Sequence, residues 1–423
     1  PPRSTLFPYT TLFRSAQPLA LAARTVLSAA LLLVSASLAA DWPTFLGPNR
    51  DGCSPDTGLL KQWPAQGPEQ LWKNDKVGEG WSSVAVVGGL VYTTGNEGGN
   101  QMLICLDDKT GKEKWRAAQG PAASHGKYPG ARATPTVDGD RIYLTGGNGL
   151  VTCQSAKDGR VLWKKDMRAD LGGKVGGWLY AESVTVLGKL AVVTPGGPHP
   201  VVAFDKPTGS KVWESDKPAT AGYASLLPVT LDGSTVLVNG TQSGLLVIDA
   251  KSGKELYRNP FAENNVANAP TPAFADGRLF WAVGYRKGGI CLKVSHAGGK
   301  WAFEDAWTTA DFACHPGNYV VALGRVFGKG KGGLVCADLK SGQTLWTERG
   351  GAGQVTFADG LLYSFADQGG RLTLIDPNAE NNRVKGSLQV AGNGNSWAHP
   401  VVVNGHLYLR YDTNLYCFDV KAK

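Results

Sequence analysis

Short runs of alternating apolar and polar residues, separated by glycine-rich turns, recur along most of this chain. The stretch "ATPTVDGDRIYLTGGNGLVTC" shows the pattern, with β-branched and aromatic residues in each run and Gly or Asp in each turn. Alternation with a period of two is typical of half-buried β-strands, and such turns are typical of hairpins. The pattern therefore predicts a succession of antiparallel strands.

Each group of runs ends in one motif, in which an apolar run leads to Asp, then to a Gly turn, and then to an aromatic residue. "LICLDDKTGKEKW" (103–115) and "LVCADLKSGQTLW" (334–346) are near-copies. Eight copies align at steps of 38 to 50 residues. The Asp position falls at Asp107, Ser155, Asp205, Asp249, Lys293, Asp338, Asp376 and Asp419, and the aromatic position at Trp115, Trp163, Trp213, Tyr257, Trp301 and Trp346. A period near 40 to 50 residues predicts a β-propeller or a related repeat array.

The run that ends in the aromatic residue brings each repeat to four strands, so we predict an all-β fold, an eight-bladed β-propeller of four-stranded antiparallel blades. The last repeat lacks its fourth run, because only "KAK" follows "LYCFDV". "EQLWKNDKV" (69–77) offers a spare strand with Trp72. We predict that this N-terminal strand closes the ring, so that the leader and closing strand (41–80) form one domain with the repeats (81–423).

The Asp, Gly and aromatic residues that recur in the motif have a structural explanation. The Asp carboxylate can accept backbone N–H groups of the following turn. The turn glycine supplies a positive φ, as expected at Gly111, Gly159, Gly209, Gly253 and Gly342. The large ring can cover the seam between neighbouring blades. We therefore expect none of these three positions to be catalytic.

The cysteines follow the same alignment. Five lie two residues before the Asp position, where other repeats carry Ala, Val or Leu, namely Cys105, Cys153, Cys291, Cys336 and Cys417. Such a position predicts buried free thiols, because equivalent sites in separate blades are too far apart to pair. Cys53 and Cys314 lie outside the column, and a disulfide between them stays an open alternative.

The first forty residues differ from the repeats. Residues 1–15 include "TLFPYTTLFRS", which resembles the translation of a sequencing-library adapter, and we exclude them as an artefact. Residues 16–40 hold Arg24, an apolar run (26–34) and "SASLAA", the layout of a signal peptide. The run is shorter than the roughly 20 residues of a membrane span. We expect an exported protein, periplasmic or secreted, without a permanent membrane anchor.

The charge of the chain limits its partners. The formal net charge is +8, and it falls to +5 without Arg3, Arg14 and Arg24, because the first forty residues hold no acid. The remaining charges are scattered, and no basic run is typical of a nucleic-acid surface. We therefore expect no nucleic-acid partner.

The innermost strands of a propeller line a central funnel, so residues just ahead of each first strand are candidates for a pocket. These are Trp81, Arg132, Glu182, Tyr223, Asn268, His315, Gln354 and His399. With a planar anion, Trp81 would stack, Arg132 would pair with a carboxylate, and Glu182 would be the metal ligand or base. The alternative is a wet channel with polar walls and no ligand. No His or Cys spacing predicts a metal site, and "GKGKGG" (328–333) lacks the following helix of a dinucleotide site.

The motif of aliphatic residues, Asp, Thr-Gly-Lys and Trp resembles the PQQ-like β-propeller repeat family, over Trp42 to Val420. This family includes quinoprotein alcohol dehydrogenases and the outer-membrane assembly factor BamB. The dehydrogenase branch implies pyrroloquinoline quinone (PQQ) on the axis, with calcium, an acidic base and a disulfide of adjacent cysteines. The sequence has no Cys-Cys pair and no CxxCH haem motif. The assembly-factor branch implies a lipid-anchored scaffold, but no cysteine directly follows the apolar run (26–34) to accept a lipid.

These observations favour a non-catalytic binding or scaffold protein without a cofactor, a monomer that contacts envelope proteins through loops on one face. The first alternative is a PQQ-dependent oxidoreductase with calcium, in which Glu182 is the catalytic residue. A second alternative is recognition of envelope polysaccharide by funnel aromatics, supported by Trp81, Tyr223 and Trp397.

Overall fold

The structure is a computed structural model that describes residues 40–423, except for Lys127, Gly351 and Asn382. The expected artefact (1–15) and all of the expected signal peptide (16–40) but Ala40 lie outside the described residues. Within the described part of the chain, no helix is long and apolar enough to cross a membrane.

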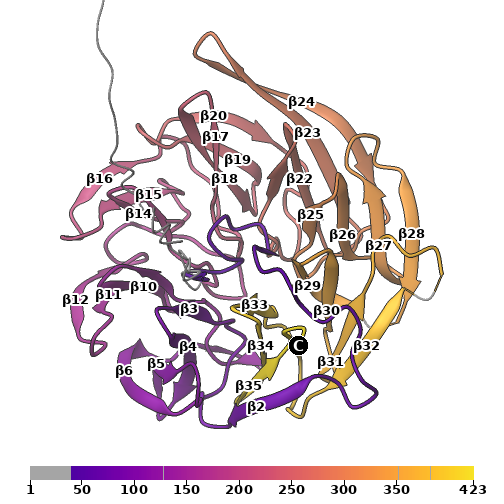
Figure 1. Cartoon of the computed structure of the whole chain (residues 1–423). Helices are drawn as coiled ribbons and strands as arrows, with labels where there is room; N and C mark the ends of the chain where they lie inside the picture. Colours follow the sequence, from indigo (N-terminus) through magenta and orange to yellow (C-terminus); the bar gives the residue numbers. More distant parts are fainter. Residues whose placement is uncertain (1–39, 127, 351, 382) are drawn as a thin grey trace, which may run out of the picture. The chain divides into compact units, whose positions relative to one another are not determined.

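Eight four-stranded antiparallel sheets, here blades 1 to 8 in chain order, stand around a ring (Figure 1). Blade 1 consists of β3 (Ala85–Val87), β4 (Leu90–Glu97), β5 (Asn100–Asp107) and β6 (Glu113–Pro121). Blade 2 consists of β9 (Thr136–Asp138), β10 (Arg141–Thr145), β11 (Leu150–Ser155) and β12 (Val161–Asp166). Blade 3 consists of β13 (Thr185–Leu187), β14 (Leu190–Val193), β15 (Val202–Asp205) and β16 (Lys211–Glu214), and blade 4 consists of β17 (Leu227–Leu231), β18 (Ser234–Thr241), β19 (Gly244–Asp249) and β20 (Glu255–Asn259).

The second half of the ring repeats this order. Blade 5 consists of β21 (Ala273–Ala275), β22 (Arg278–Val283), β23 (Gly288–Ala297) and β24 (Lys300–Thr309). Blade 6 consists of β25 (Val320–Ala322), β26 (Arg325–Lys329), β27 (Gly333–Asp338) and β28 (Thr344–Arg349). Blade 7 consists of β29 (Gly353–Ala358), β30 (Leu361–Ala366), β31 (Arg371–Ile375) and β32 (Val384–Gln389), and blade 8 of β33 (Val401–Val403), β34 (His406–Tyr411), β35 (Asn414–Asp419) and β2 (Glu69–Asn74). The predicted eight-bladed β-propeller is confirmed.

The ring closes through the N-terminal strand. β2 pairs antiparallel with β35, with Trp72 opposite Cys417. The indole Nε1 of Trp72 donates to the backbone oxygen of Asp108 in blade 1, at 2.7 Å. Across the same seam, the buried Arg410 of blade 8 donates to Ser82 Oγ at 2.6 Å. The prediction that this strand completes the last blade is therefore confirmed.

The turn aspartates have the structural role that the sequence predicted. Their Oδ1 atoms accept backbone N–H groups of the turn, for example from Thr110 to Asp107 at 3.1 Å and from Ser341 to Asp338 at 2.8 Å. All five predicted turn glycines have a positive φ, between 64° and 75° at Gly111, Gly159, Gly209 and Gly342 and 77° at Gly253.

The turn glycines have a second role that the sequence analysis missed. In five of the eight seams, an indole of one blade lies against the turn glycine of the next blade: Trp72 on Gly111, Trp115 on Gly159, Trp163 on Gly209, Trp213 on Gly253 and Trp307 on Gly342. A Cβ on Gly209 would lie 2.8 Å from Trp163, and one on Gly111 would overlap the ring of Trp72. The missing Cβ thus makes room for the ring, and these five seams depend on a Trp from one blade and a Gly from its neighbour.

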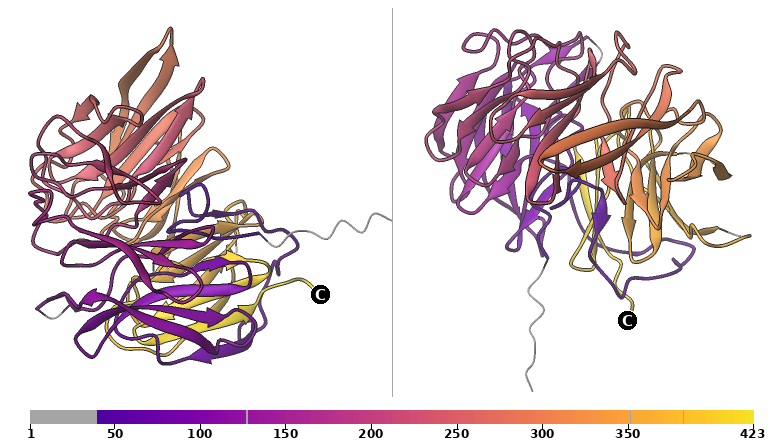
Figure 2. Two further views of the ribbon diagram at one scale, coloured as in Figure 1. Left: turned by 90° about the vertical axis from the view of Figure 1, so that its left-hand side faces the viewer. Right: turned by 90° about the horizontal axis from the view of Figure 1, so that it is seen from above.

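Blade 5 departs from the predicted alignment. Its Cys291 lies opposite Trp307, not opposite Trp301. Here β23 and β24 have ten residues each, and their hairpin projects beyond the other blades (Figure 2). Trp301 lies near the tip of this hairpin, where its Nε1 donates to Ser234 Oγ at 3.1 Å. The placement of Trp301 in the tryptophan column was wrong, because the longer hairpin moves the turn away from the column.

All seven cysteines are free. The five of the predicted column are fully buried, which confirms their interpretation as apolar core residues. Cys53 and Cys314 are unpaired as well, so the alternative of a disulfide between them is wrong. The Cys53 thiol instead lies 3.8 Å from the backbone oxygen of Val321.

The leader crosses the centre of the ring (Figure 1). Trp42 donates its backbone N–H to Val86 of blade 1 at 2.7 Å, and the guanidinium of Arg50 donates to the backbone oxygen of Val184 in blade 3 at 2.6 Å. β1 (Cys53–Ser54) then pairs in parallel with β29 of blade 7, opposite blade 3. The leader therefore connects several blades and forms part of the wall of the axial cavity described below.

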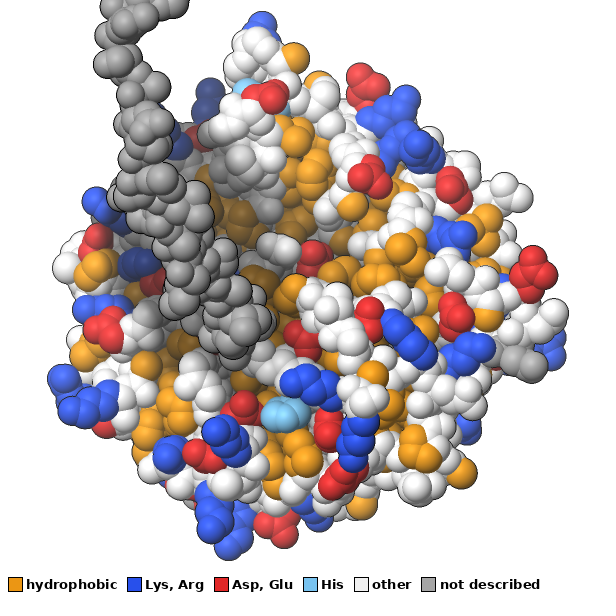
Figure 3. Space-filling model, in the orientation of Figure 1, with side chains coloured by type: hydrophobic (Ala, Val, Ile, Leu, Met, Phe, Trp, Pro, Cys, Tyr) orange, Lys and Arg blue, Asp and Glu red, His pale blue; other side chains and the backbone are white. Residues whose placement is uncertain are grey.

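Charges on the surface are mixed. Figure 3 shows Lys and Arg side chains interspersed with Asp and Glu on the visible face. Among the described residues, eleven pairs join Lys or Arg to Asp or Glu, including Lys206 with Asp138 and Lys211 with Glu214, both at 2.5 Å. This agrees with the scattered charges of the sequence.

Gly111→Ala is expected to destabilise the protein more than Gly88→Ala. Both glycines have positive φ, 64° and 58°, but only Gly111 faces a tryptophan, since nothing lies within 4 Å of a Cβ on Gly88. The left-handed backbone costs about 1 kcal/mol in both variants. Overpacking against Trp72 adds about 1–3 kcal/mol at Gly111. Urea unfolding measures the free energy of unfolding of both variants. Equal losses of stability in the two would contradict the role of Gly111 in the seam.

Candidate functional site

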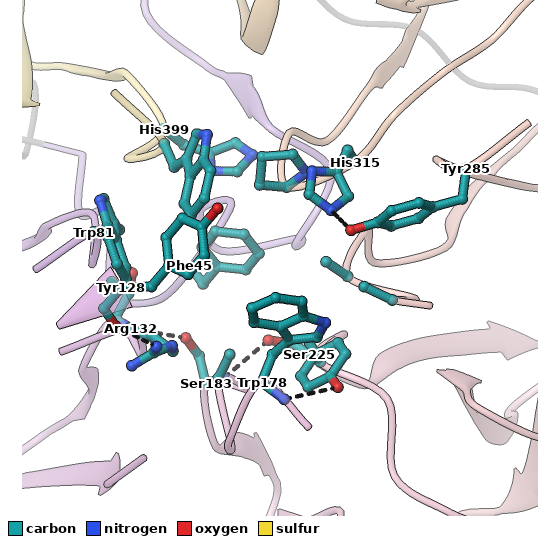
Figure 4. Close-up of a pocket in the computed structure, with 17 residues that line it drawn as sticks. Phe45, Trp81, Tyr128, Arg132, Trp178, Ser183, Ser225, Tyr285, His315 and His399 are labelled. Carbon is teal, nitrogen blue, oxygen red and sulfur yellow. Dashed lines mark hydrogen bonds between the residues drawn. The ribbon is translucent and has the colours of Figure 1, made fainter. Parts of the chain in front are cut away.

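A cavity of about 220 Å³ lies at the ring's centre, where loops enter the innermost strands of several blades. Figure 4 shows its side chains converging from blades far apart in the sequence. It is lined by Phe45, Trp81, Tyr128, Arg132, Thr134, Trp178, Ala181, Ser183, Tyr223, Ser225, Ala267, Ala269, Tyr285, His315, Pro316, Trp397 and His399. Aromatic rings make up most of this wall.

Five of the eight predicted funnel residues line the cavity: Trp81, Arg132, Tyr223, His315 and His399. The structure does not bring Glu182, Asn268 or Gln354 to it. That any of the five binds a ligand stays a prediction.

The alternation of side chains explains two of the three misplaced residues. Ala181 and Ser183 face the cavity, so the side chain of Glu182 between them points away, and Ala267 and Ala269 exclude Asn268 in the same way. An error of one residue in the alignment thus reversed the predicted direction.

Asn268 and Gln354 are both fully buried. The amide of Asn268 donates to the backbone oxygen of Thr241 at 2.7 Å and thereby fixes a loop. The side-chain nitrogen and oxygen of Gln354 have no hydrogen-bond partner among the described residues. None of the described residues of blade 7 lines the cavity.

Glu182 is enclosed inside blade 3. Its carboxylate accepts the backbone N–H of Thr194 at 2.7 Å and also the Thr194 hydroxyl. Burial raises the pKa of Glu182 from 4.5 to about 7, although these hydrogen bonds and the charge of Arg50 act in the opposite direction. The group that the sequence placed as base or metal ligand is therefore a structural acid.

The sequence analysis missed four of the rings. Phe45 comes from the leader, Tyr128 from the hairpin of β7 (Ser124–His125) and β8 (Tyr128–Pro129), Trp178 from the loop before blade 3, and Tyr285 from the turn between β22 and β23. None occupies a repeated position, so the alignment could not select them. The signal available was the presence of aromatic residues in loops that carry no core pattern.

The rings pack against one another. The centroids of Trp81 and Trp397 are 5.1 Å apart, and Tyr128 stacks on Trp397 at 5.7 Å with 26° between the planes. Trp178 meets Tyr128 edge to face at 5.5 Å. Such contacts hold the rings in fixed orientations, so the wall is preorganised.

Arg132 is the cation of this wall. Its guanidinium donates to the backbone oxygens of Gly130 and Tyr128, both at 2.8 Å, and lies 5.2 Å from the ring centroid of Trp81. Burial lowers the pKa of Arg132 to about 10, so it stays charged at neutral pH. Among the described residues, no carboxylate forms an ion pair with it.

A series of hydrogen bonds links the innermost strands beside the cavity. In each, the backbone N–H of one blade donates to a side chain of a following blade; we call this series the inner belt. Its members are Ser83, Thr134, Ser183, Ser225, Thr271, Asn318 and His399. Ser83 Oγ closes it by donating to the backbone oxygen of His399 at 2.7 Å. The belt fixes Thr134, Ser183, Ser225 and His399 where they line the cavity.

The two histidines of the cavity differ in their surroundings. Burial lowers the pKa of His399 from 6.5 to about 3, and its Nε2 accepts the backbone N–H of Asn318 at 3.2 Å. This neutral imidazole is thus a member of the belt. His315 lies 2.5 Å from the Tyr285 hydroxyl, and burial lowers its pKa as well. Neither histidine adds positive charge at neutral pH.

The cavity does not fit a quinone held with calcium. Calcium takes oxygen ligands, commonly carboxylates. None of the described residues that line the cavity is acidic, and Glu182 is bonded to Thr194 instead. Nor do the described residues contain a group of three or more His, Cys, Asp or Glu side chains placed to hold a metal. The arrangement provides stacking surfaces, one cation and several hydroxyls, which are groups of recognition.

Glu182→Gln is expected to reduce the pH dependence of stability. The folded state keeps the Glu182 proton up to about pH 7, whereas an unfolded glutamate loses it near 4.5, so the free energy of unfolding falls as pH rises between these values. The fall is about 3 kcal/mol. The amide titrates nowhere in this range and can keep both contacts with Thr194. Urea unfolding at pH 4.5 and 7.5 should therefore show a variant that gains stability relative to wild type at the higher pH.

The matched control is Glu304→Gln, on the exposed strand β24. It should follow the wild-type pH dependence. If Glu182→Gln did the same, Glu182 would not be the buried proton-holding group inferred above.

Comparisons with known proteins agree with the fold and the repeats. A family model described as outer membrane protein assembly factor BamB matches residues 58–197 and 122–348. BamB of Bordetella pertussis is 24% identical over 329 residues, which cover 66% of this chain and 81% of that protein. The solved structure of BamB from Moraxella catarrhalis has a TM-score of 0.60 at 13% identity, over 84% of this chain and 98% of that one, and this likeness supports the fold alone.

A quinoprotein is also similar, over a shorter region. Quinohemoprotein alcohol dehydrogenase ADH-IIG of Pseudomonas putida is 30% identical over 140 residues, which cover 30% of this chain and 19% of the dehydrogenase. The chain thus matches about a fifth of that enzyme's length. The repeat motif, the eight-bladed ring and a family match over more than half of the sequence show that this chain belongs to the BamB-like family of PQQ-like repeat β-propellers.

Proposed function

We propose that this chain is an exported, monomeric scaffold protein that binds other envelope proteins through loops on one face of the propeller and catalyses no reaction itself. The relative from Bordetella pertussis is named as an outer membrane protein assembly factor, and assembly of envelope proteins is the process we propose here. The family match supports the scaffold, and the signal-peptide pattern of residues 16–40 supports export.

The observation that carries the proposal is the chemistry of the cavity wall. Its rings, hydroxyls and Arg132 are suited to binding, but no acidic residue among those described lines it. Catalysis of hydride or proton transfer from an alcohol needs a base near the substrate, and the expected base, Glu182, is enclosed in blade 3. The site therefore supports recognition better than reaction.

The face around the cavity also exposes apolar side chains. Val266, in the loop before blade 5, is 54% exposed beside the cavity residue Ala267. Tyr285, on the turn between β22 and β23, is 41% exposed. Leu323 is similarly exposed, at 52%, but lies in the turn between β25 and β26, at the opposite end of the strands. Substitutions of Val266 and Leu323 therefore allow partner binding by the cavity face to be compared with binding by the opposite face.

A PQQ-dependent oxidoreductase is the second candidate. Arg132 and Trp81 lie beside each other, as a stacked and paired planar anion would require. Glu182, the third residue expected for this oxidoreductase, does not line the cavity with Arg132 and Trp81. Dye-linked alcohol oxidation after addition of quinone and calcium tests this candidate directly.

Val266→Asp is expected to reduce the recovery of envelope partners at least about fivefold, because a charge in an apolar contact is costly to desolvate. Purified wild type, Val266→Asp and Leu323→Asp are used as baits in envelope extracts, and the recovered proteins are quantified by mass spectrometry. Leu323→Asp is the matched control and should recover the same partners as wild type.

Three results would contradict the scaffold proposal. The first is equal recovery of partners by all three baits, and the second is that wild type enriches no protein. The third is saturable alcohol oxidation by the wild-type protein with quinone and calcium, lost in Arg132→Gln.

A further inference from the structure

The polar part of the cavity wall consists of hydrogen-bond donors. Three hydroxyl oxygens already accept backbone N–H groups of the inner belt: Thr134 from Ser83 at 2.9 Å, Ser183 from Thr134 at 3.1 Å, and Ser225 from Ser183 at 2.9 Å. No hydrogen bond donated by these hydroxyls joins the described residues. Since a hydroxyl has one hydrogen to donate, all three can donate it into the cavity.

Arg132 adds a charged donor to the same side. It has five N–H groups, two of which donate to the backbone oxygens of Gly130 and Tyr128. The others are available to a ligand. Figure 4 shows Arg132, Ser183 and Ser225 along one side of the cavity, with His399 and His315 across from them. A wall of donors around an unpaired cation is complementary to an anion.

The rest of the wall selects for a ring. Trp81, Trp397, Tyr128 and Trp178 hold their planes around the cavity, and Phe45 meets His399 edge to face at 4.9 Å. The volume of about 220 Å³ is smaller than the roughly 300–1,000 Å³ of sites for drug-sized ligands. One six-membered ring, in contact with aromatic faces, fits these limits.

The spread of the donors distinguishes between possible anions. Arg132 and Thr134 belong to the entry of blade 2, Ser183 to that of blade 3, and Ser225 to that of blade 4. A simple aromatic acid offers only the two oxygens of one carboxylate to donors that stand on three blades, which favours a ligand with more acceptors, since an unpaired buried donor has a cost. A ring with a carboxylate and several hydroxyls supplies acceptors along the whole row. A cationic ligand is disfavoured by the charge of Arg132.

We propose that the axial cavity is a binding site for a sugar ring that carries a carboxylate, a uronic acid, with its carboxylate on Arg132, its hydroxyls on Thr134, Ser183 and Ser225, and its C–H face on Trp81 and Trp397. Such a ring is a unit of acidic polysaccharides. This site goes beyond the scaffold function and stands or falls independently of it, because it requires no partner protein.

The test is calorimetric titration of the purified full chain with four probes: D-glucuronate, D-glucose, benzoate and D-glucosamine. Glucuronate is expected to bind saturably and at least about tenfold more tightly than the other three, since only it offers both a negative charge and hydroxyls. Arg132→Gln should weaken glucuronate about 10- to 100-fold and leave glucose unchanged. Arg286→Gln, which removes an exposed charge from the neighbouring turn, is the matched control and should bind like wild type.

Three outcomes would overturn the proposal: no saturable binding of glucuronate, equal binding of glucuronate and glucose, or tighter binding of benzoate. Circular dichroism checks that Arg132→Gln is folded. Should it not fold, Arg132→Lys keeps the charge but loses the planar fork, and it should still bind glucuronate more tightly than glucose. The wild-type probe series decides the matter without either variant.

Discussion

The structure depends on the closure of its ring, in which a strand from the beginning of the chain completes a sheet with three strands from the end. β2 fills the outer place of blade 8, and Trp72 joins blade 8 to blade 1. Without this strand, β35 would present an unpaired edge, and the seam between the first and last blades would lose its indole. Arg410 adds a buried cation that bonds several groups of blade 1. The closed ring is what brings the eight innermost strands around one axis.

The seams explain how a repeat of modest length produces a rigid body. In five of the seams an indole packs on a glycine of the next blade, and the inner belt joins most of the blades again near the axis. The two sets of contacts lie at the outer and inner sides of the sheets, so most blades are held on both. The consequence for function is a cavity with fixed walls, because the hydroxyls that line it are also members of the belt.

The electrostatics of the cavity separate recognition from reaction. Arg132 keeps its charge in a wall of rings, while Glu182, the acid that the sequence analysis placed in the funnel, is enclosed by Thr194 and holds its proton to about pH 7. His399 is neutral and structural. A wall with one cation, neutral imidazoles and donor hydroxyls favours an acceptor-rich anion, which is the basis of both the proposed lack of catalysis and the proposed sugar-acid site.

The sequence by itself determined the ring. Residues such as Asp107, Gly111 and Trp72 repeat because most blades need the same turn and the same seam, and a repeated local requirement leaves a readable pattern. The site was only partly predictable, since one residue of misalignment turned Glu182 and Asn268 away from the cavity, and Phe45, Tyr128 and Trp178 lie in segments that occur once. Trp301 was misplaced because blade 5 has a longer hairpin than its neighbours. Only the tertiary structure decided which side chains meet at the axis, because that depends on how separate loops fold over the ring and not on any spacing along the chain.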